Sequence, residues 1–344
     1  MIRARSVIAA LCASATVLAC GPGTLVPAAE PPRAAGSRAD IEQTDLLLGT
    51  QLAALRGHNL VAVELVKRRQ STEALLVLDR GRNYAHFLQN FAEKDAESPF
   101  NPEINRAIDA ATAALKRGDG SGTVTEALVT AGRATLRIES EIVGKTSELA
   151  AYKASVVSTL ADHAGLEYDL AISADPFDLG GYRLAYGLLR EAKNIHGGLT
   201  NVLEQNTNDE ARAAEIMFAA MFGAMPSSDT PSELRRPFEV PAVAYVLGEV
   251  LADEFGSITP PPRNRLAFVA PVLEEALGAY ESGEAGVADV LVQKVRASQS
   301  SAGEPVEAEL DRLSAAIRGG AADSDIATLV EESSELAADA AAGE

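Results

Sequence analysis

The chain has 344 residues, enough for two ordinary domains or one elongated helical array. Its formal net charge of -19 argues against direct binding to nucleic-acid phosphates or anionic lipid headgroups, because like charges repel, whereas cations and basic protein surfaces remain compatible partners. Aromatic residues make up only 5% of the chain, tryptophan is absent and alanine supplies much of the 47% hydrophobic fraction, which favours closely packed helices over sheets.

The first nineteen residues have the pattern of an export signal. Arg3 and Arg5 give a positive start, and residues 6–19 form an apolar run. A permanent membrane-spanning helix needs about 20 apolar residues, so this shorter run is typical of a signal peptide. The small Ala19 before Cys20 resembles the lipobox that lipoprotein signal peptidase recognises. An ordinary secretory signal with a coincidental cysteine is the alternative.

The lipobox resemblance implies a lipid anchor on Cys20. In such lipoproteins the cysteine sulfur carries diacylglycerol, residues 1–19 are removed and the new amino group is acylated; several acyl chains anchor more firmly than one. Gly21 follows the cysteine in place of aspartate, which by the enterobacterial sorting pattern implies the periplasmic face of the outer membrane. Because Cys12 would leave with the signal, the mature chain would have no thiol for a disulfide, a nucleophile or a metal site.

After the cleavage site, a short tether leads into a predicted all-α body. Residues 20–39 contain four prolines with glycine and alanine and no helical period, so we expect a lipidated flexible tether. From residue 40 the apolar residues recur at helical spacing, which predicts an antiparallel helical bundle or an array of helical hairpins. In a first domain, residues 40–225, we expect helices at about 41–69, from 71, and at 83–95, 102–117, 123–144, 147–173, 179–206 and 208–224.

A change in charge and a cluster of helix breakers predict a second, acidic helical domain at residues 232–344. Pro226 and Pro231 enclose a short polar segment between the two domains. From residue 207 onward the chain has 25 acidic and 9 basic residues, against 24 and 21 before it. We expect helices at about 238–256, 263–283, 286–300, 305–318 and 324–341.

Two segments indicate internal repetition of helical hairpins. Residues 108–118 can be aligned with residues 310–320, and each is followed by a small-residue loop and another helical pattern. A duplicated hairpin would explain this, and so would chance similarity between alanine-rich helices. Residues 279–284 resemble a tetratricopeptide turn, although the chain lacks a 34-residue period.

Histidine and carboxylate residues give the only candidate metal site. His163 and Glu167 are four residues apart, so both side chains lie on one helix face, as ligands of a divalent metal can. A metal site needs further ligands, of which His58 is a candidate, and a hydrogen-bonded surface pair is the alternative. Gly57 beside His58 costs about 1 kcal/mol relative to alanine in a helix, which indicates either a close helix approach or a ligand. His196 precedes Gly197 and Gly198, which predict a kink or a tight helix crossing.

The segment that contains His58 also carries a family resemblance. Residues 57–65, followed by a polar turn and residues 72–75, are similar to the opening of uncharacterised helical proteins exported by proteobacteria, and the likeness extends loosely to about residue 200. There is a more distant resemblance to imelysin-like iron-regulated lipoproteins, whose signature is G-x-H-x-x-E. That motif is absent here, because Glu64 follows His58 after six residues and lies on another helix face.

The function expected from the sequence is therefore that of a lipid-anchored helical binding or scaffold protein. No serine-nucleophile elbow, H-E-x-x-H motif, Walker loop or EF-hand occurs in the chain, so we expect no enzyme activity and no cofactor. The expected partners are the membrane, through lipid on Cys20, and another envelope protein, but not nucleic acid. The alternative is a metal-binding or small-ligand-binding lipoprotein of imelysin-like type.

Overall fold

A computed structural model describes residues 41–93, 102–200, 209–232, 234–235, 239–258, 269–298 and 304–342. The predicted signal peptide, Cys20 and the tether lie outside the described residues. Within those ranges the chain forms twelve α-helices and one short 3₁₀ helix, with no strand, which confirms the all-α prediction. None of the described helices combines the length and hydrophobicity that crossing a bilayer requires.

The helices follow one another in hairpin order. Their bounds are α2 Gln43–Lys67, α3 Ser71–Glu93, α4 Pro102–Arg117, α5 Ser121–Ile142, η3 Gly144–Glu148, α6 Ala150–Ser173, α7 Leu179–Thr200, α8 Asp209–Ala224, α9 Glu239–Phe255, α10 Val269–Glu281, α11 Ala285–Ser298, α12 Glu304–Gly319 and α13 Asp323–Ala342. The separate helices expected from residue 71 and over 83–95 are one helix, α3. Gly81 lies inside this helix, where the His58 side chain of α2 packs closely against it.

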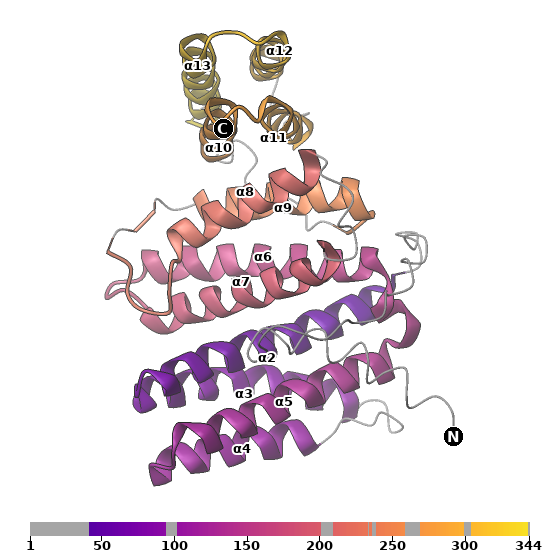
Figure 1. The fold of residues 1–344 in the computed structure, drawn as a ribbon, viewed down its shortest axis with the longest axis vertical. Helices are drawn as coiled ribbons and strands as arrows, with labels where there is room; N and C mark the ends of the chain where they lie inside the picture. The colour runs from indigo at the N-terminus through magenta and orange to yellow at the C-terminus, as the bar shows by residue number, and fades with distance from the viewer. Residues whose placement is uncertain are drawn as a thin grey trace, which may run out of the picture.

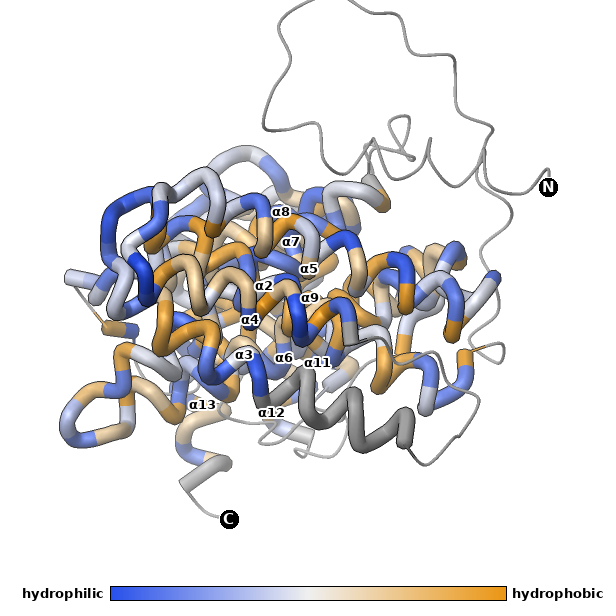
Figure 2. Tube along the Cα trace, turned by 90° about the horizontal axis from the view of Figure 1, so that it is seen from below, coloured by the Kyte–Doolittle hydropathy of each residue, from blue (hydrophilic) through white to orange (hydrophobic). Residues whose placement is uncertain are grey.

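Helix pairs stack in layers, as Figure 1 shows. The pair α4 and α5 lies at one end, followed by α2 with α3, α6 with α7, and α8 with α9. The helices α10 to α13 form a bundle at the other end, where they are seen nearly end on. Apolar and hydrophilic stretches alternate along the helices in Figure 2, as amphipathic helices require, and one apolar core contains buried residues from α2 through α13.

The two ends of the stack are four-helix units with the same neighbour order. In α2–α5, as in α10–α13, each helix packs against the next and the fourth packs against the first. Each unit contains three hairpins, and the four of these whose turns lie among the described residues pass through a residue with positive φ, namely Arg69, Gly118, Gly283 and Gly320. The amide of the following residue then donates to a carbonyl five residues earlier, as in Gln70 to Leu65 at 2.9 Å and Glu284 to Ala279 at 2.9 Å. This is the Schellman pattern of helix termination.

The segments with similar sequences occupy corresponding places in these units. Residues 108–118 comprise the end of α4, the third helix of the first unit, and the residue after it, and residues 310–320 comprise the same part of α12, the third helix of the second. The amide of Asp119 donates to Ala114 at 2.9 Å, and that of Ala321 donates to Ala316 at 3.1 Å. This is the correspondence that duplication of a helical unit requires.

The proline-flanked segment between α8 and α9 is fastened to the first half of the stack. The buried Ser228 donates its hydroxyl to Glu64 of α2 at 2.9 Å, and its carbonyl accepts from Arg183 Nε of α7 at 3.0 Å. Asp229 pairs with Arg68 at 2.5 Å. The helix after this segment, α9, packs mainly against α6 and α8. The predicted acidic domain, residues 232–344, thus includes one helix whose main neighbours belong to residues 40–225.

Candidate functional site

His58 is a buried, neutral histidine in the middle of α2. Only 2% of its surface is exposed, and Nδ1 lies 2.9 Å from the carbonyl oxygen of Ala54. Burial lowers the pKa of His58 to about 4, and the charge of Arg80 acts in the same direction. The ring is therefore uncharged at neutral pH and belongs to the contact between α2 and α3, where it packs against Gly81.

The adjacent Gly57 marks a close helix crossing. A Cβ atom built on Gly57 would lie 2.4 Å from the carbonyl oxygen of Gly187 in α7, and one built on Gly187 would lie 2.8 Å from the carbonyl oxygen of Gly57. The two backbones touch, so neither position has room for a side chain. Of the two explanations that the sequence allowed for Gly57, the structure supports close helix approach. The sequence did not identify Gly187 as its partner.

The predicted pair His163 and Glu167 lies on α6, and both side chains are partly exposed. Burial raises the pKa of Glu167 above its ordinary value, while the charge of Arg80 acts in the opposite direction. Arg80, on α3, also donates to both carboxylate oxygens of Asp178, at 3.0 and 3.1 Å.

Arg80 thus acts electrostatically on two of the three predicted metal ligands, His58 and Glu167. The positive charge that acts on these two predicted ligands is therefore a side chain of the protein, Arg80. Among the residues that the structure describes, no group of three or more histidine, cysteine, aspartate or glutamate side chains could hold a metal ion. Arg80 could not be identified from the sequence, because its partner Asp178 lies 98 residues further along the chain.

A buried ionic network joins four helices near the centre of the stack. Arg56 of α2, only 8% exposed, donates from Nε to Glu191 of α7 at 2.5 Å and from a terminal nitrogen to Glu139 of α5 at 2.8 Å. The hydroxyl of Tyr152 in α6 donates to Glu139 at 3.2 Å, and Gly49 leaves room for that hydroxyl. Burial raises the pKa of Glu191, whereas Arg56 opposes this shift. Since breaking a buried ion pair is costly, the network fixes how α2–α5 sit on α6 and α7.

His196 is a second buried histidine, not part of a site with His58 or His163. It is fully buried on α7, with its ring centre 5.0 Å from that of Phe218, and Nδ1 lies 3.4 Å from Glu215 Oε1. Burial lowers its pKa to about 4, and the charge of Lys193 contributes. Of the kink or tight helix crossing predicted at Gly197 and Gly198, the tight crossing is wrong, because a Cβ at either glycine would meet nothing within 4 Å.

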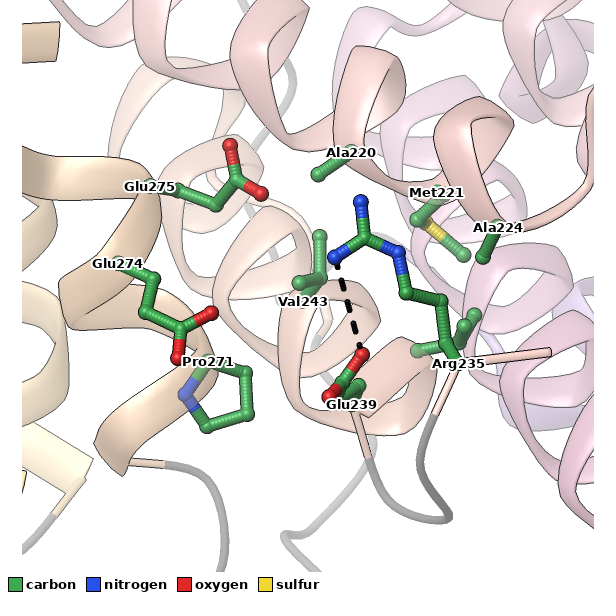
Figure 3. A pocket seen from close by; sticks show the side chains of 10 residues that line it. Ala220, Met221, Ala224, Arg235, Glu239, Val243, Pro271, Glu274 and Glu275 are labelled. Carbon is green, nitrogen blue, oxygen red and sulfur yellow. Dashed lines mark ion pairs between the residues drawn. The ribbon is translucent and has the colours of Figure 1, made fainter. Parts of the chain in front are cut away.

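A small pocket lies where α8, α9 and α10 meet (Figure 3). Arg235 points across it, 4.0 Å from Glu239, and faces Glu274 and Glu275 of α10. The volume of this pocket is about 20 Å³, which is room for about one water molecule. The apolar floor comes from Ala220, Met221, Ala224, Val240 and Val243. A second cavity of about 390 Å³ adjoins Arg235 and is lined by Gly223, Pro226, Pro231, Ser232 and Leu234.

Comparison with protein-family models, with curated proteins and with solved structures finds no significant match to this chain. The described polar clusters lie between helices, and further charged side chains lie on the outer surface of the helices. On that surface α13 carries six exposed carboxylates and no lysine or arginine, and of these Glu332 is paired with Arg312 at 3.4 Å.

Proposed function

We propose that this chain is a non-enzymatic, lipid-anchored scaffold or binding protein of the bacterial cell envelope. The observation that carries the proposal is the apolar run of residues 6–19 ending in Ala19 and Cys20. Lipid on Cys20 would hold the protein at the periplasmic face of the outer membrane, and residues 21–39 would separate the helical body from the bilayer.

The hairpin architecture supports a binding role. Stacked helical hairpins expose long helix surfaces, and proteins built in this way use those surfaces to bind other proteins. The exposed carboxylates of α13 favour a partner with a basic surface, because complementary charge accelerates encounter and disfavours acidic competitors. The partner proposed here is therefore another envelope protein with a basic face.

The anchor is tested with a pair of cysteine substitutions. Cells expressing the chain are fed an alkyne analogue of palmitate, and membrane and soluble fractions are compared. We expect Cys20→Ala to abolish labelling and membrane retention, and Cys12→Ala to leave both unchanged, because only Cys20 follows the lipobox-like residues. Labelling that persists in Cys20→Ala would refute the anchor.

The same membrane fractions test the binding role. Cross-linking before solubilisation is expected to give one discrete adduct with the anchored wild-type chain, and less of it at high salt, since charge complementarity is screened. The Cys20→Ala chain is expected to give much less adduct. Complete absence of an adduct from the anchored protein would contradict a scaffold role.

A further inference from the structure

The contact between the α10–α13 unit and the rest of the stack has an excess of carboxylates. We call it the seam, and it joins α8 and α9 to α10 and α11. At one end of α9, Glu239, Glu274 and Glu275 line the pocket together with Arg235, which is the one cation among the described residues that line it (Figure 3). Burial raises the pKa of Glu275 there. The other end of α9, about 22 Å away at 1.5 Å per residue, carries further acidic residues.

Two ion pairs hold that second end of the seam. Arg212 of α8 pairs with Glu284, the residue before α11, and Lys294 of α11 pairs with Asp253 of α9. Asp209, at the start of α8, lies against Gly286. Arg212 and Lys294, the described cations at this end, are therefore already paired with other carboxylates. Glu210 and Glu254 are two further acidic residues at the same end.

Glu254 has no described partner in this surrounding. Both of its carboxylate oxygens are buried from solvent and accept no hydrogen bond within the described part of the chain. Burial raises the pKa of Glu254 to about 7, and the charge of Glu210 adds to the shift. By contrast, the buried carboxylate of Glu191 is paired with Arg56. An ionised carboxylate without a partner is costly to bury, so the seam favours the protonated form of Glu254.

We propose that protonation of Glu254 closes the seam and that its ionisation loosens the α10–α13 unit from α8 and α9. The helices packed against α9 bring few other charges to this end. Those of α8 are Asp209, Glu210 and the paired Arg212, and that of α11 is the paired Lys294. On α6, the Ser155 hydroxyl accepts a hydrogen bond from the amide of Ile258, just after α9, and the charged residue closest to Ser155 along the sequence is the exposed Lys153. Of the three charged residues of α10, Glu274 and Glu275 line the pocket at the opposite end, and the exposed Glu281 ends the helix three residues before Glu284.

The direction of the pH effect follows from the sign of the pKa shift. The pKa of Glu254 in the closed seam is above its ordinary value of 4.5. The stabilisation of the closed form is thus complete below about 4.5 and is lost as the pH rises through about 7. The device is independent of the proposed anchor, because it involves only the helical body.

Hydrogen–deuterium exchange on the purified full chain tests this inference. Protection is compared at about pH 5.5 and about pH 8, after normalisation for the intrinsic exchange rate at each pH. Peptides from the end of α9 and the start of α11 are expected to lose protection about three- to tenfold between the two conditions, because Glu254 is half-buried and solvent screens part of its charge.

Three variants separate this inference from a general pH effect. Glu254→Gln, which mimics the protonated acid, is expected to keep the seam protected at both pH values. Glu210→Gln should shift the loss to lower pH, because the charge of Glu210 helps to raise the pKa of Glu254. The matched control Glu249→Gln lies on the same helix and is expected to behave like the wild type. Equal loss of protection in wild type and Glu254→Gln, or no loss in the wild type, would overturn the proposal.

Discussion

Replacing Gly57 with alanine tests the crossing on which the stack depends. The new Cβ would lie 2.4 Å from the Gly187 carbonyl oxygen, whereas an ordinary contact is about 3.4 Å, so α2 and α7 must separate by about 1 Å. Overpacking of this kind costs about 1–3 kcal/mol, and the upper half applies because backbone lies on both sides. Alanine returns about 1 kcal/mol of helix propensity. The net expectation is a loss of about 1–2 kcal/mol.

Gly132→Ala in α5 is the matched control. Gly132 also lies within a helix, but a Cβ there would meet nothing within 4 Å, so only the propensity gain of about 0.5–1 kcal/mol remains. Urea unfolding followed by far-ultraviolet circular dichroism should therefore give opposite signs for the two variants. If Gly57→Ala were as stable as Gly132→Ala, the backbone contact between α2 and α7 would not exist as described.

Two further predictions concern buried charge. Arg56→Met should cost about 3–5 kcal/mol, because it leaves two buried carboxylates without their cation, whereas Arg312→Met on the exposed surface should cost less than about 1 kcal/mol in the same urea titrations. His58 and His196 have pKa values lowered to about 4 in the folded chain, so they stabilise it fully above about pH 6.5 and lose that contribution as the pH falls toward about 4. Replacing both with glutamine should flatten this part of the pH dependence of unfolding, and an unchanged slope would contradict their buried, neutral state.

Local sequence pattern was sufficient to predict most helices. For α4 the expected and observed bounds agree at 102–117, because an apolar period of 3.6 residues ends at Gly118, a residue suited to positive φ. The split expected within α3 was wrong, because Gly81 lies inside the helix against the His58 side chain and does not interrupt it. The sequence alone could not distinguish a glycine that follows the end of a helix, such as Gly118, from one that lies inside a helix, such as Gly81.

Pairing between helices could not be predicted. Arg56 is 135 residues from Glu191 and 83 from Glu139, and helical periodicity shows which face is apolar but not which helix will cover it. For the candidate site, the four-residue spacing placed His163 and Glu167 on one helix, as observed. The spacing could not predict that Arg80 of α3 lies close enough to Glu167 to oppose the rise in its pKa that burial causes. Contacts of long sequence separation, rather than local chemistry, determine the surroundings of each predicted ligand.

The buried histidines and Glu254 respond to acid in opposite directions. Acidification below about pH 6.5 weakens the fold around His58 and His196, whereas acidification below about pH 7 tightens the seam at Glu254. A melting temperature measured across this range sums the two effects and can conceal both. Local exchange separates them, since α2 and α7 contain the histidines and α9 contains the glutamate. Protection that falls in α2 and α7 on acidification while it rises in α9 and α11 would show that the four-helix unit docks independently of the stability of the stack.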